Sequence, residues 1–291
     1  MKILIIGGTG LVGNKLVELA HGKFEVHSTY HSHPMGTAGF HKLEVTDFKA
    51  AGKLIEELAP GAVVNTSAYH QVDKCETEKE SARVVNVDSA VNIAEACAAI
   101  GAHCVYFSTE YVFDGKKGAP YSEEDITNPL GYYGQTKAIA EKAILGTKAD
   151  ALIARTSVVY GLNETKLNFA TWALGELEKK REVKIVDDQV GSPTLADNLA
   201  EAVLKAIEYR KTGIYHLAGG EAMSRYNFTL TLAEVFGLDK KLVKPIKTEE
   251  LKQKAKRPLY APLNVEKAEK ELGVKMLFVR EGLEKMKNQL R

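Results

Sequence analysis

The feature that most constrains the fold of this chain is a glycine-rich turn between a short apolar segment and an amphipathic one. Residues 3–6 read Ile-Leu-Ile-Ile, which is typical of a buried strand, and residues 11–20 have the apolar spacing of a helix. Glycines between them permit a tight turn, let a pyrophosphate approach N–H groups at the helix start, and allow close packing of helix on strand. The G-x-x-G-x-x-G pattern therefore predicts a dinucleotide site made by Gly7, Thr9, Gly10, Leu11, Val12 and Gly13.

Short apolar runs alternate with longer amphipathic stretches up to about residue 155. The expected strands are residues 3–6, 24–30, 43–46, 62–66, 103–108 and 151–155, and the expected helices are residues 11–20, 48–58, 79–100 and 131–145. This order predicts a parallel sheet with right-handed crossovers and helices on both faces. The fold class is therefore α/β, a doubly wound Rossmann sheet.

The pattern changes after residue 155, where helical segments are separated by loops rich in Gly, Pro and Asp. Helices are expected at residues 167–179, 195–210, 226–236 and 265–272, with brief strands at 183–186 and 214–217. We therefore predict a dinucleotide-binding domain over residues 1–160. Residues 161–291 are expected to form mainly a smaller, mixed α/β substrate-binding lobe, with some segments returning to the main sheet.

Charge and cysteine content limit the function further. A net charge of +1 leaves no electrostatic footprint for nucleic acid or for an anionic membrane, and no apolar run approaches the ~18 residues of a membrane span. Cys75, Cys97 and Cys104 form no C-x-x-C, so neither a disulfide framework nor a thiolate metal site is indicated. We expect a cytoplasmic protein with small-molecule or protein partners, and a homodimer is left open.

The end of the second expected strand bears on cofactor choice. NAD-selective folds place an acidic residue about 20 positions after the glycine turn, but this strand ends in Tyr30 and His31. A 2′-phosphate meets no repulsion there, although no arginine holds it, so NADP(H) is favoured and NAD(H) stays open. His31 and His33 could be read as metal ligands, but a solvated loop is the better interpretation, and no metal is predicted. Asp47 could accept a hydrogen bond from adenine or could cap the following helix.

A phenol and an ammonium four residues apart point to proton transfer. Tyr133 and Lys137 share one face in the opening turn of an expected helix, and a nearby cation favours the phenolate. Such spacing is also common on a solvated helix face. Thr109 is expected at the carboxyl end of a central strand, where its hydroxyl could hold a substrate oxygen. The three side chains are predicted to converge over the nicotinamide position.

The glycine turn, the Ser-Thr at 108–109 and the Tyr-x-x-x-Lys at 133–137 resemble the extended short-chain dehydrogenase/reductase superfamily. Further motifs are similar to the dTDP-4-dehydrorhamnose reductase family within it; they lie at residues 63–69, 72–74, 108–115, 128–134, 188–194 and 257–258. The resemblance implies hydride transfer from NAD(P)H to the 4-keto carbon of a nucleotide-linked deoxysugar, as in conversion of dTDP-4-dehydro-L-rhamnose to dTDP-L-rhamnose. It also implies that Tyr133 protonates the new alkoxide.

The same resemblance assigns roles to further residues. It implies that Thr109 orients the carbonyl and that Lys137 lowers the pKa of Tyr133 and anchors the cofactor. Ser67, Ala68, Tyr69 and Asn86 would line the cofactor path, and the sugar-nucleotide pocket would include Glu110, Tyr111, Gln189, Ser192 and Arg257. Arg257 fits a diphosphate, although it could also be a surface residue beside Pro258.

Three positions depart from the family pattern and leave alternatives. The family usually has aspartate where Glu110 stands, and often has tryptophan where Val158 and Arg225 stand. A related dehydratase is disfavoured, because Tyr111 occupies the place of its glutamate base. An NADP-binding regulatory subunit, like the beta subunit of methionine adenosyltransferase, resembles the same reductases and stays open as the alternative to an enzyme.

Overall fold

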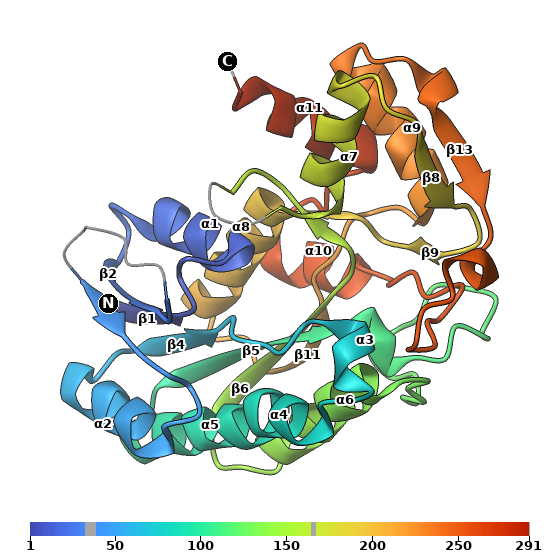
Figure 1. Cartoon of the computed structure of the whole chain (residues 1–291). Coiled ribbons are helices and arrows are strands. Elements are labelled where there is room, and N and C mark those ends of the chain that lie inside the picture. The colour runs from blue at the N-terminus through green and yellow to red at the C-terminus, as the bar shows by residue number, and fades with distance from the viewer. Residues whose placement is uncertain (33–38, 164–166, 291) are drawn as a thin grey trace.

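A seven-stranded parallel sheet forms the centre of the computed structural model, which describes residues 1–32, 39–163 and 167–290 (Figure 1). The strand order is β11-β6-β5-β4-β1-β2-β3, and every neighbouring pair is parallel. The strands are β1 (Lys2–Ile6), β2 (Glu25–Tyr30), β3 (Phe40–Lys42), β4 (Ala62–Asn65), β5 (His103–Thr109), β6 (Asp150–Thr156) and β11 (Gly213–His216). The predicted doubly wound fold is confirmed.

Helices cover both faces of this sheet (Figure 1). One face carries α1 (Leu11–Ala20), α8 (Ala196–Glu208) and α10 (Glu266–Leu272), and the other carries α2 (Phe48–Leu58), α5 (Ser89–Ile100) and α6 (Tyr132–Leu145). The stretch expected as one helix over 79–100 comprises α4 (Lys79–Arg83), a π-helical turn η1 (Val84–Asp88) and α5. The short helix α3 (Val72–Cys75) precedes it.

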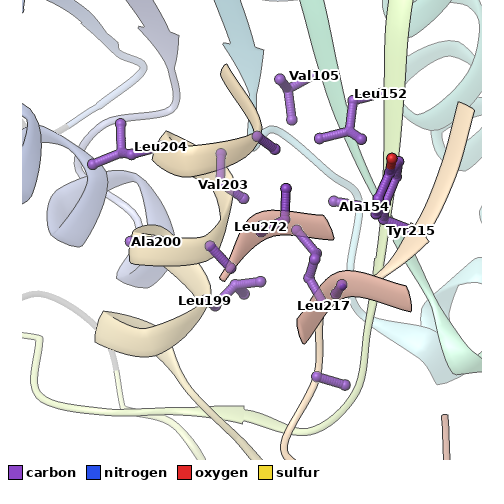
Figure 2. Packing of buried hydrophobic residues seen from close by; sticks show 14 of the residues in the cluster. Val105, Leu152, Ala154, Leu199, Ala200, Val203, Leu204, Tyr215, Leu217 and Leu272 are labelled. Carbon is purple, nitrogen blue, oxygen red and sulfur yellow. The ribbon is translucent and has the colours of Figure 1, made fainter. Parts of the chain in front are cut away.

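Alternation of side chains along β1 explains why the strand is apolar throughout. Ile3 and Ile5 belong to the hydrophobic cluster under α1, α8 and α10, whereas Leu4 and Ile6 belong to the cluster under α2, α5 and α6. Figure 2 shows the first cluster, in which leucines and valines of α8 pack against Val105 and other sheet residues. Because both faces of the sheet are buried, polar side chains that could bind ligands are expected at the ends of the strands.

A smaller lobe has its own hydrophobic cluster, built from α7 (Phe169–Glu178), α9 (Arg225–Phe236) and α11 (Val279–Asn288) around a parallel pair of strands, β8 (Val183–Val186) and β13 (Val243–Ile246) (Figure 1). Two further pairs are β7 (Val159–Tyr160) with β10 (Thr194–Leu195), and β9 (Val190–Gly191) with β12 (Met223–Ser224). Three 3-10 turns are η2 (Glu110–Val112), η3 (Lys240–Leu242) and η4 (Thr248–Leu251).

Several segments differ from the sequence expectations. The third strand is Phe40–Lys42, and the predicted strand at 43–46 is wrong: Leu43 is buried against the α2 side, but the backbone there leads into a turn before α2. In line with the expected return of some segments of 161–291 to the main sheet, the segment around residue 214 pairs with β6 at its edge, and α8 and α10 pack on it. α11 and β13 were not predicted. Of the helices in the described ranges, none is both long and apolar enough to cross a membrane.

Two helical glycines provide a matched test of this packing. A Cβ at Gly13 would lie 2.8 Å from the Cα of Gly8 and closer still to the Gly7 carbonyl oxygen, whereas a Cβ at Gly52 would meet no atom within 4 Å. We expect Gly13→Ala to lower the free energy of unfolding by about 1–3 kcal/mol through overpacking. Gly52→Ala should raise it by about 1 kcal/mol through helix propensity. Urea unfolding followed by circular dichroism measures both, and a Gly13→Ala variant as stable as Gly52→Ala would contradict the close approach at Gly13.

Candidate active site

The glycine turn forms a narrow cradle between β1 and α1. Gly7 has a φ of 86°, and its N–H donates to Thr29 Oγ1 at 3.0 Å, while the Gly8 N–H donates to the Thr29 carbonyl at 2.9 Å. A Cβ at Gly8 would collide with Ser28 Oγ. α1 then begins at Leu11, and Gly10 at the N-cap position supplies no side-chain cap to the helix. The cradle fits a pyrophosphate, which helix N-termini bind through backbone N–H groups.

Residues after β2 and β3 lie where an adenosine ribose is expected in such a fold. His31 lies 2.7 Å from Glu44, and both side chains are exposed. His33 lies outside the described residues, so a His31–His33 metal site has no described geometry; elsewhere in the described ranges, no three His, Cys, Asp or Glu side chains group to hold a metal. Asp47 caps α2 by accepting from the Ala50 N–H at 3.0 Å. The capping interpretation of Asp47 is therefore correct, and its proposed contact with adenine stays a prediction.

Asn86 fixes the segment that follows β4. Its Oδ1 accepts from the Tyr69 N–H at 2.8 Å, and its Nδ2 donates to the Tyr69 carbonyl at 3.2 Å and to Thr136 Oγ1 at 3.1 Å. Ser67 is held in turn by Asn65, whose Oδ1 accepts from the Ser67 hydroxyl at 2.5 Å. The Ser67-Ala68-Tyr69 segment is thereby joined to the first turn of α6.

Thr109, Tyr133 and Lys137 come from two neighbouring elements. Thr109 ends β5, and its hydroxyl donates to Glu110 Oε2 at 2.8 Å and accepts from the Tyr111 N–H at 3.2 Å. α6 begins at Tyr132, which places Tyr133 and Lys137 one helical turn apart. The rings of Tyr111 and Tyr133 meet edge to face, with centroids 5.8 Å apart.

Gly134 makes this contact between α6 and the loop after β5 possible. A Cβ at that position would collide with the Tyr111 carbonyl oxygen and lie 3.0 Å from Pro129 Cβ. The helix can therefore approach the loop closely only with glycine at 134. This approach brings the Tyr133 phenol to the carboxyl end of β5.

Burial shifts the proton equilibria of these groups in opposite directions. Desolvation, with the charge of Glu110 and the neighbouring Tyr111, raises the pKa of Tyr133, and an interaction with Thr109 opposes the shift only in part. Desolvation lowers the pKa of Lys137 to about 7, although Glu141 acts to raise it. Burial outweighs any lowering of the Tyr133 pKa by Lys137 in this structure, so that part of the role of Lys137 stays a prediction. The Lys137 ammonium instead faces the Tyr106 ring, with Nζ 4.1 Å from its centroid.

The expected substrate residues divide between a pocket and its supporting wall. Glu110, Tyr111 and Gln189 line a narrow pocket of about 20 Å³, a volume that suits about one water molecule. Ser192 does not line it, because its side chain is buried and accepts from the Leu263 N–H at 3.1 Å. Apolar side chains complete the wall: Val158, Phe169, Met223 and Phe228. The sequence marks Val158 as a departure from the family pattern, and no motif marks the other three.

Arg225 brings a charge into this pocket. Its guanidinium lies 5.0 Å from the Phe169 ring centroid, and its charge acts to lower the pKa of both Glu110 and Tyr111, which burial raises. A cation thus stands where the family often has an indole. The polar side of the pocket is therefore formed by a carboxyl, a phenol and a guanidinium.

Arg257 borders a second, wider cleft of about 690 Å³. It forms a two-pronged ion pair with Asp73, at 2.9 and 3.2 Å, and its side chain is only 10% exposed, so it is not a free surface residue. Lys116, Lys247, Lys252 and Lys256 line the same cleft, together with the carboxylates of Asp114, Asp188 and Glu249. The cations outnumber the carboxylates, which favours an anionic group.

Comparison with known proteins agrees with the site. The whole chain, residues 1–291, matches the family described as RmlD substrate binding domain. The spore coat polysaccharide biosynthesis protein SpsK of Bacillus subtilis is 34% identical over 97% of this chain and 95% of its own length. The dTDP-4-dehydrorhamnose reductase of Escherichia coli is 32% identical, with 100% of this chain and 98% of that protein covered.

Solved structures give the same result. A dTDP-4-dehydrorhamnose reductase from Clostridium acetobutylicum has a TM-score of 0.90 at 33% identity, covering 100% of this chain and 99% of that one. The Bacillus anthracis dTDP-4-dehydrorhamnose reductase, solved in complex with NADP, has a TM-score of 0.90 at 27% identity, covering 99% of this chain and 100% of that one. The motifs, the fold and the full-length matches agree, and the chain belongs to the RmlD family, which includes the dTDP-4-dehydrorhamnose reductases.

Proposed function

We propose that this chain is an NAD(P)H-dependent ketoreductase that reduces the 4-keto group of a nucleotide-linked deoxysugar, converting dTDP-4-dehydro-L-rhamnose to dTDP-L-rhamnose. The observation that carries the proposal is the interaction of Thr109, at the end of β5, with Tyr133 of α6, one helical turn before Lys137. Relatives that match nearly the whole chain are named as dTDP-4-dehydrorhamnose reductases. Those names do not favour the regulatory-subunit alternative.

NADP(H) is the favoured cofactor, and NAD(H) remains usable. The Bacillus anthracis relative was solved with NADP, and the end of β2 in this chain carries Tyr30 and His31 without an acidic residue. Gly7 to Gly13 would hold the pyrophosphate, because side chains at Gly8 and Gly13 would fill the cradle. When bound, a reduced nicotinamide supplies a hydride to the carbonyl carbon.

The roles of the chain's own residues follow from their chemistry. Thr109 would hold the substrate carbonyl oxygen with its hydroxyl, and Tyr133 would give its phenolic proton to the oxygen as negative charge develops there. A raised pKa suits Tyr133 to this direction of reaction, because the phenol keeps its proton at neutral pH until the alkoxide takes it. Lys137 would contact the nicotinamide ribose and resupply the proton.

Substrate recognition is assigned to the lobe in this proposal, with residues 1–160 as the cofactor domain and 161–291 as mainly the substrate lobe. The sugar would occupy the pocket of Glu110, Tyr111 and Gln189, and Arg257 at the adjoining cleft would face the diphosphate. Ser192 would act through its hydrogen bond to the Leu263 backbone. The proposal includes a cytoplasmic location, and sedimentation would distinguish a monomer from a homodimer.

A reductase assay tests the activity directly. Purified protein should oxidise NADPH, and NADH more slowly, when given dTDP-4-dehydro-L-rhamnose, and the loss of nicotinamide absorbance measures this. A small panel of other keto-sugar nucleotides would then define the sugar and the base. No substrate-dependent oxidation with either cofactor, together with co-purification of an adenosyltransferase catalytic chain, would favour the regulatory alternative instead.

Removing one hydroxyl tests the proton donor. Tyr133→Phe should lower kcat by at least about 100-fold, the usual scale of general acid catalysis, while NADPH affinity stays nearly unchanged. Tyr132→Phe is the matched control, because this neighbouring phenol lies under Lys79, with Nζ 5.3 Å from the ring centroid, and not against Tyr111. Turnover by Tyr133→Phe at the rate of Tyr132→Phe would refute the assigned role.

A further inference from the structure

A buried ion pair lies behind the candidate active site. Arg155 Nε donates to Glu141 Oε1 at 2.9 Å, and its terminal nitrogen donates to Glu141 Oε2 at 2.7 Å. The two side chains are only 3% and 5% exposed. Both carboxylate oxygens are thus engaged by one guanidinium, in the geometry that makes arginine–carboxylate pairs strong and directional.

The pair is placed to act on Lys137 and on the loop after β5. Glu141 follows Lys137 by one turn on α6, so both project from the same side of the helix. Arg155 lies on β6 beside Ser108 of β5, the residue before Thr109. Its guanidinium also lies 5.1 Å from the ring centroid of Phe113, the residue just after η2.

The charge balance around Lys137 depends on this pair. Titratable side chains on α6 and on the elements around it include Cys75 from α3, Asp88 from η1, Cys97 from α5, Tyr106 from β5, Glu110 and Tyr111 from η2, Tyr133 and Glu141 from α6, Arg155 from β6 and His216 from β11; the charged side chains of α4, Lys79, Glu80 and Arg83, are exposed. The phenols and thiols are neutral at pH 7, because burial raises the pKa of each, and for Cys97 a hydrogen bond with Cys104 raises it further than burial does.

The remaining groups leave Glu141 as the anion that acts on Lys137. Burial lowers the pKa of His216 to about 3, so this imidazole, whose Nε2 is 3.5 Å from Arg155, is neutral. Glu110 is held by Thr109, and Asp88 pairs with Arg83 at 3.4 Å. Glu141 is the charged group that raises the pKa of Lys137 against desolvation, and Arg155 already neutralises it.

We infer that Glu141 and Arg155 are a positioning pair that controls the proton on Lys137: by engaging both carboxylate oxygens, Arg155 keeps Glu141 from becoming a full counter-ion of the ammonium. Lys137 can then release and regain a proton instead of remaining a permanent cation. The inference rests on the proposed function for the use of that proton, in reprotonating Tyr133 after each turnover. The effect of the pair on Lys137 can be measured without turnover.

Removing only Arg155 and removing both members of the pair should shift the titration midpoint of Lys137 in opposite directions. Arg155→Met leaves the Glu141 carboxylate facing Lys137, and the Lys137 midpoint should rise by about one pH unit or more. The double variant Glu141→Gln, Arg155→Met removes both charges, which avoids an unpaired buried charge and should lower the midpoint below that of the wild type. NMR of the full chain labelled with 13C at lysine Cε measures the midpoint, and loss of one signal in Lys137→Arg identifies it.

Two further variants separate electrostatics from folding. Arg155→Lys keeps the positive charge but loses the two-pronged contact with Glu141, so the Lys137 midpoint should lie between those of wild type and Arg155→Met. This variant provides the test if Arg155→Met does not fold. Asp150→Asn breaks an exposed pair with Arg210 at 2.8 Å and should leave the Lys137 midpoint unchanged.

The outcomes distinguish this inference from the proposed function. Opposite shifts support the positioning role, and a parallel shift in the pH profile of kcat would connect it to catalysis. Equal midpoints in all variants, or shifts in the same direction for the single and double variants, would overturn the inference even if the reductase assay succeeds. Opposite shifts of the Lys137 midpoint in a protein with no reductase activity would support the positioning role of the Glu141–Arg155 pair and contradict only the proposed enzyme activity.

Discussion

Burial of the parallel sheet on both faces is the constraint on which the rest of the molecule depends. Helices cover each face, so the central strands are largely apolar, as at residues 3–6 and 62–64, and polar groups that could bind ligands lie mainly where strands end. Gly7 follows β1, Thr109 ends β5, and Val158 follows β6 by two residues. The glycine turn, Thr109 and the pocket that Val158 lines therefore lie along the carboxyl edge of the sheet, beside the smaller lobe.

Desolvation at that edge also determines the chemistry of the site. The same removal of water raises the pKa of Tyr133 and lowers that of Lys137, so the neutral form of each group is favoured. A phenol that holds its proton and an amine that releases one near neutral pH are suited to supplying protons in sequence. In the proposed reaction Lys137 would therefore resupply a proton to Tyr133.

Local sequence patterns could predict the sheet, the glycine turn and the placement of Tyr133 on α6, because each depends on residues close together in the chain. The strand expected at 43–46 failed because Leu43 is buried like a strand residue although its backbone leads into a turn. The partnership of Glu141 with Arg155 could not be predicted, because a helix and the following strand bring them together across a loop with no characteristic spacing. The apolar wall of the sugar pocket likewise depends on how the lobe packs.

The narrowness of the pocket at Glu110 and Tyr111 has a kinetic consequence for the proposed sugar substrate. A space that suits a single water molecule must widen before it admits a hexose ring, so the side chains that line it would have to move apart. Part of the binding free energy of the sugar is then used to hold the pocket open. The apparent dissociation constant is therefore the intrinsic constant divided by the fraction of molecules that are open. Association would be slower than diffusion, and discrimination among sugars would arise partly from which of them stabilise the open form.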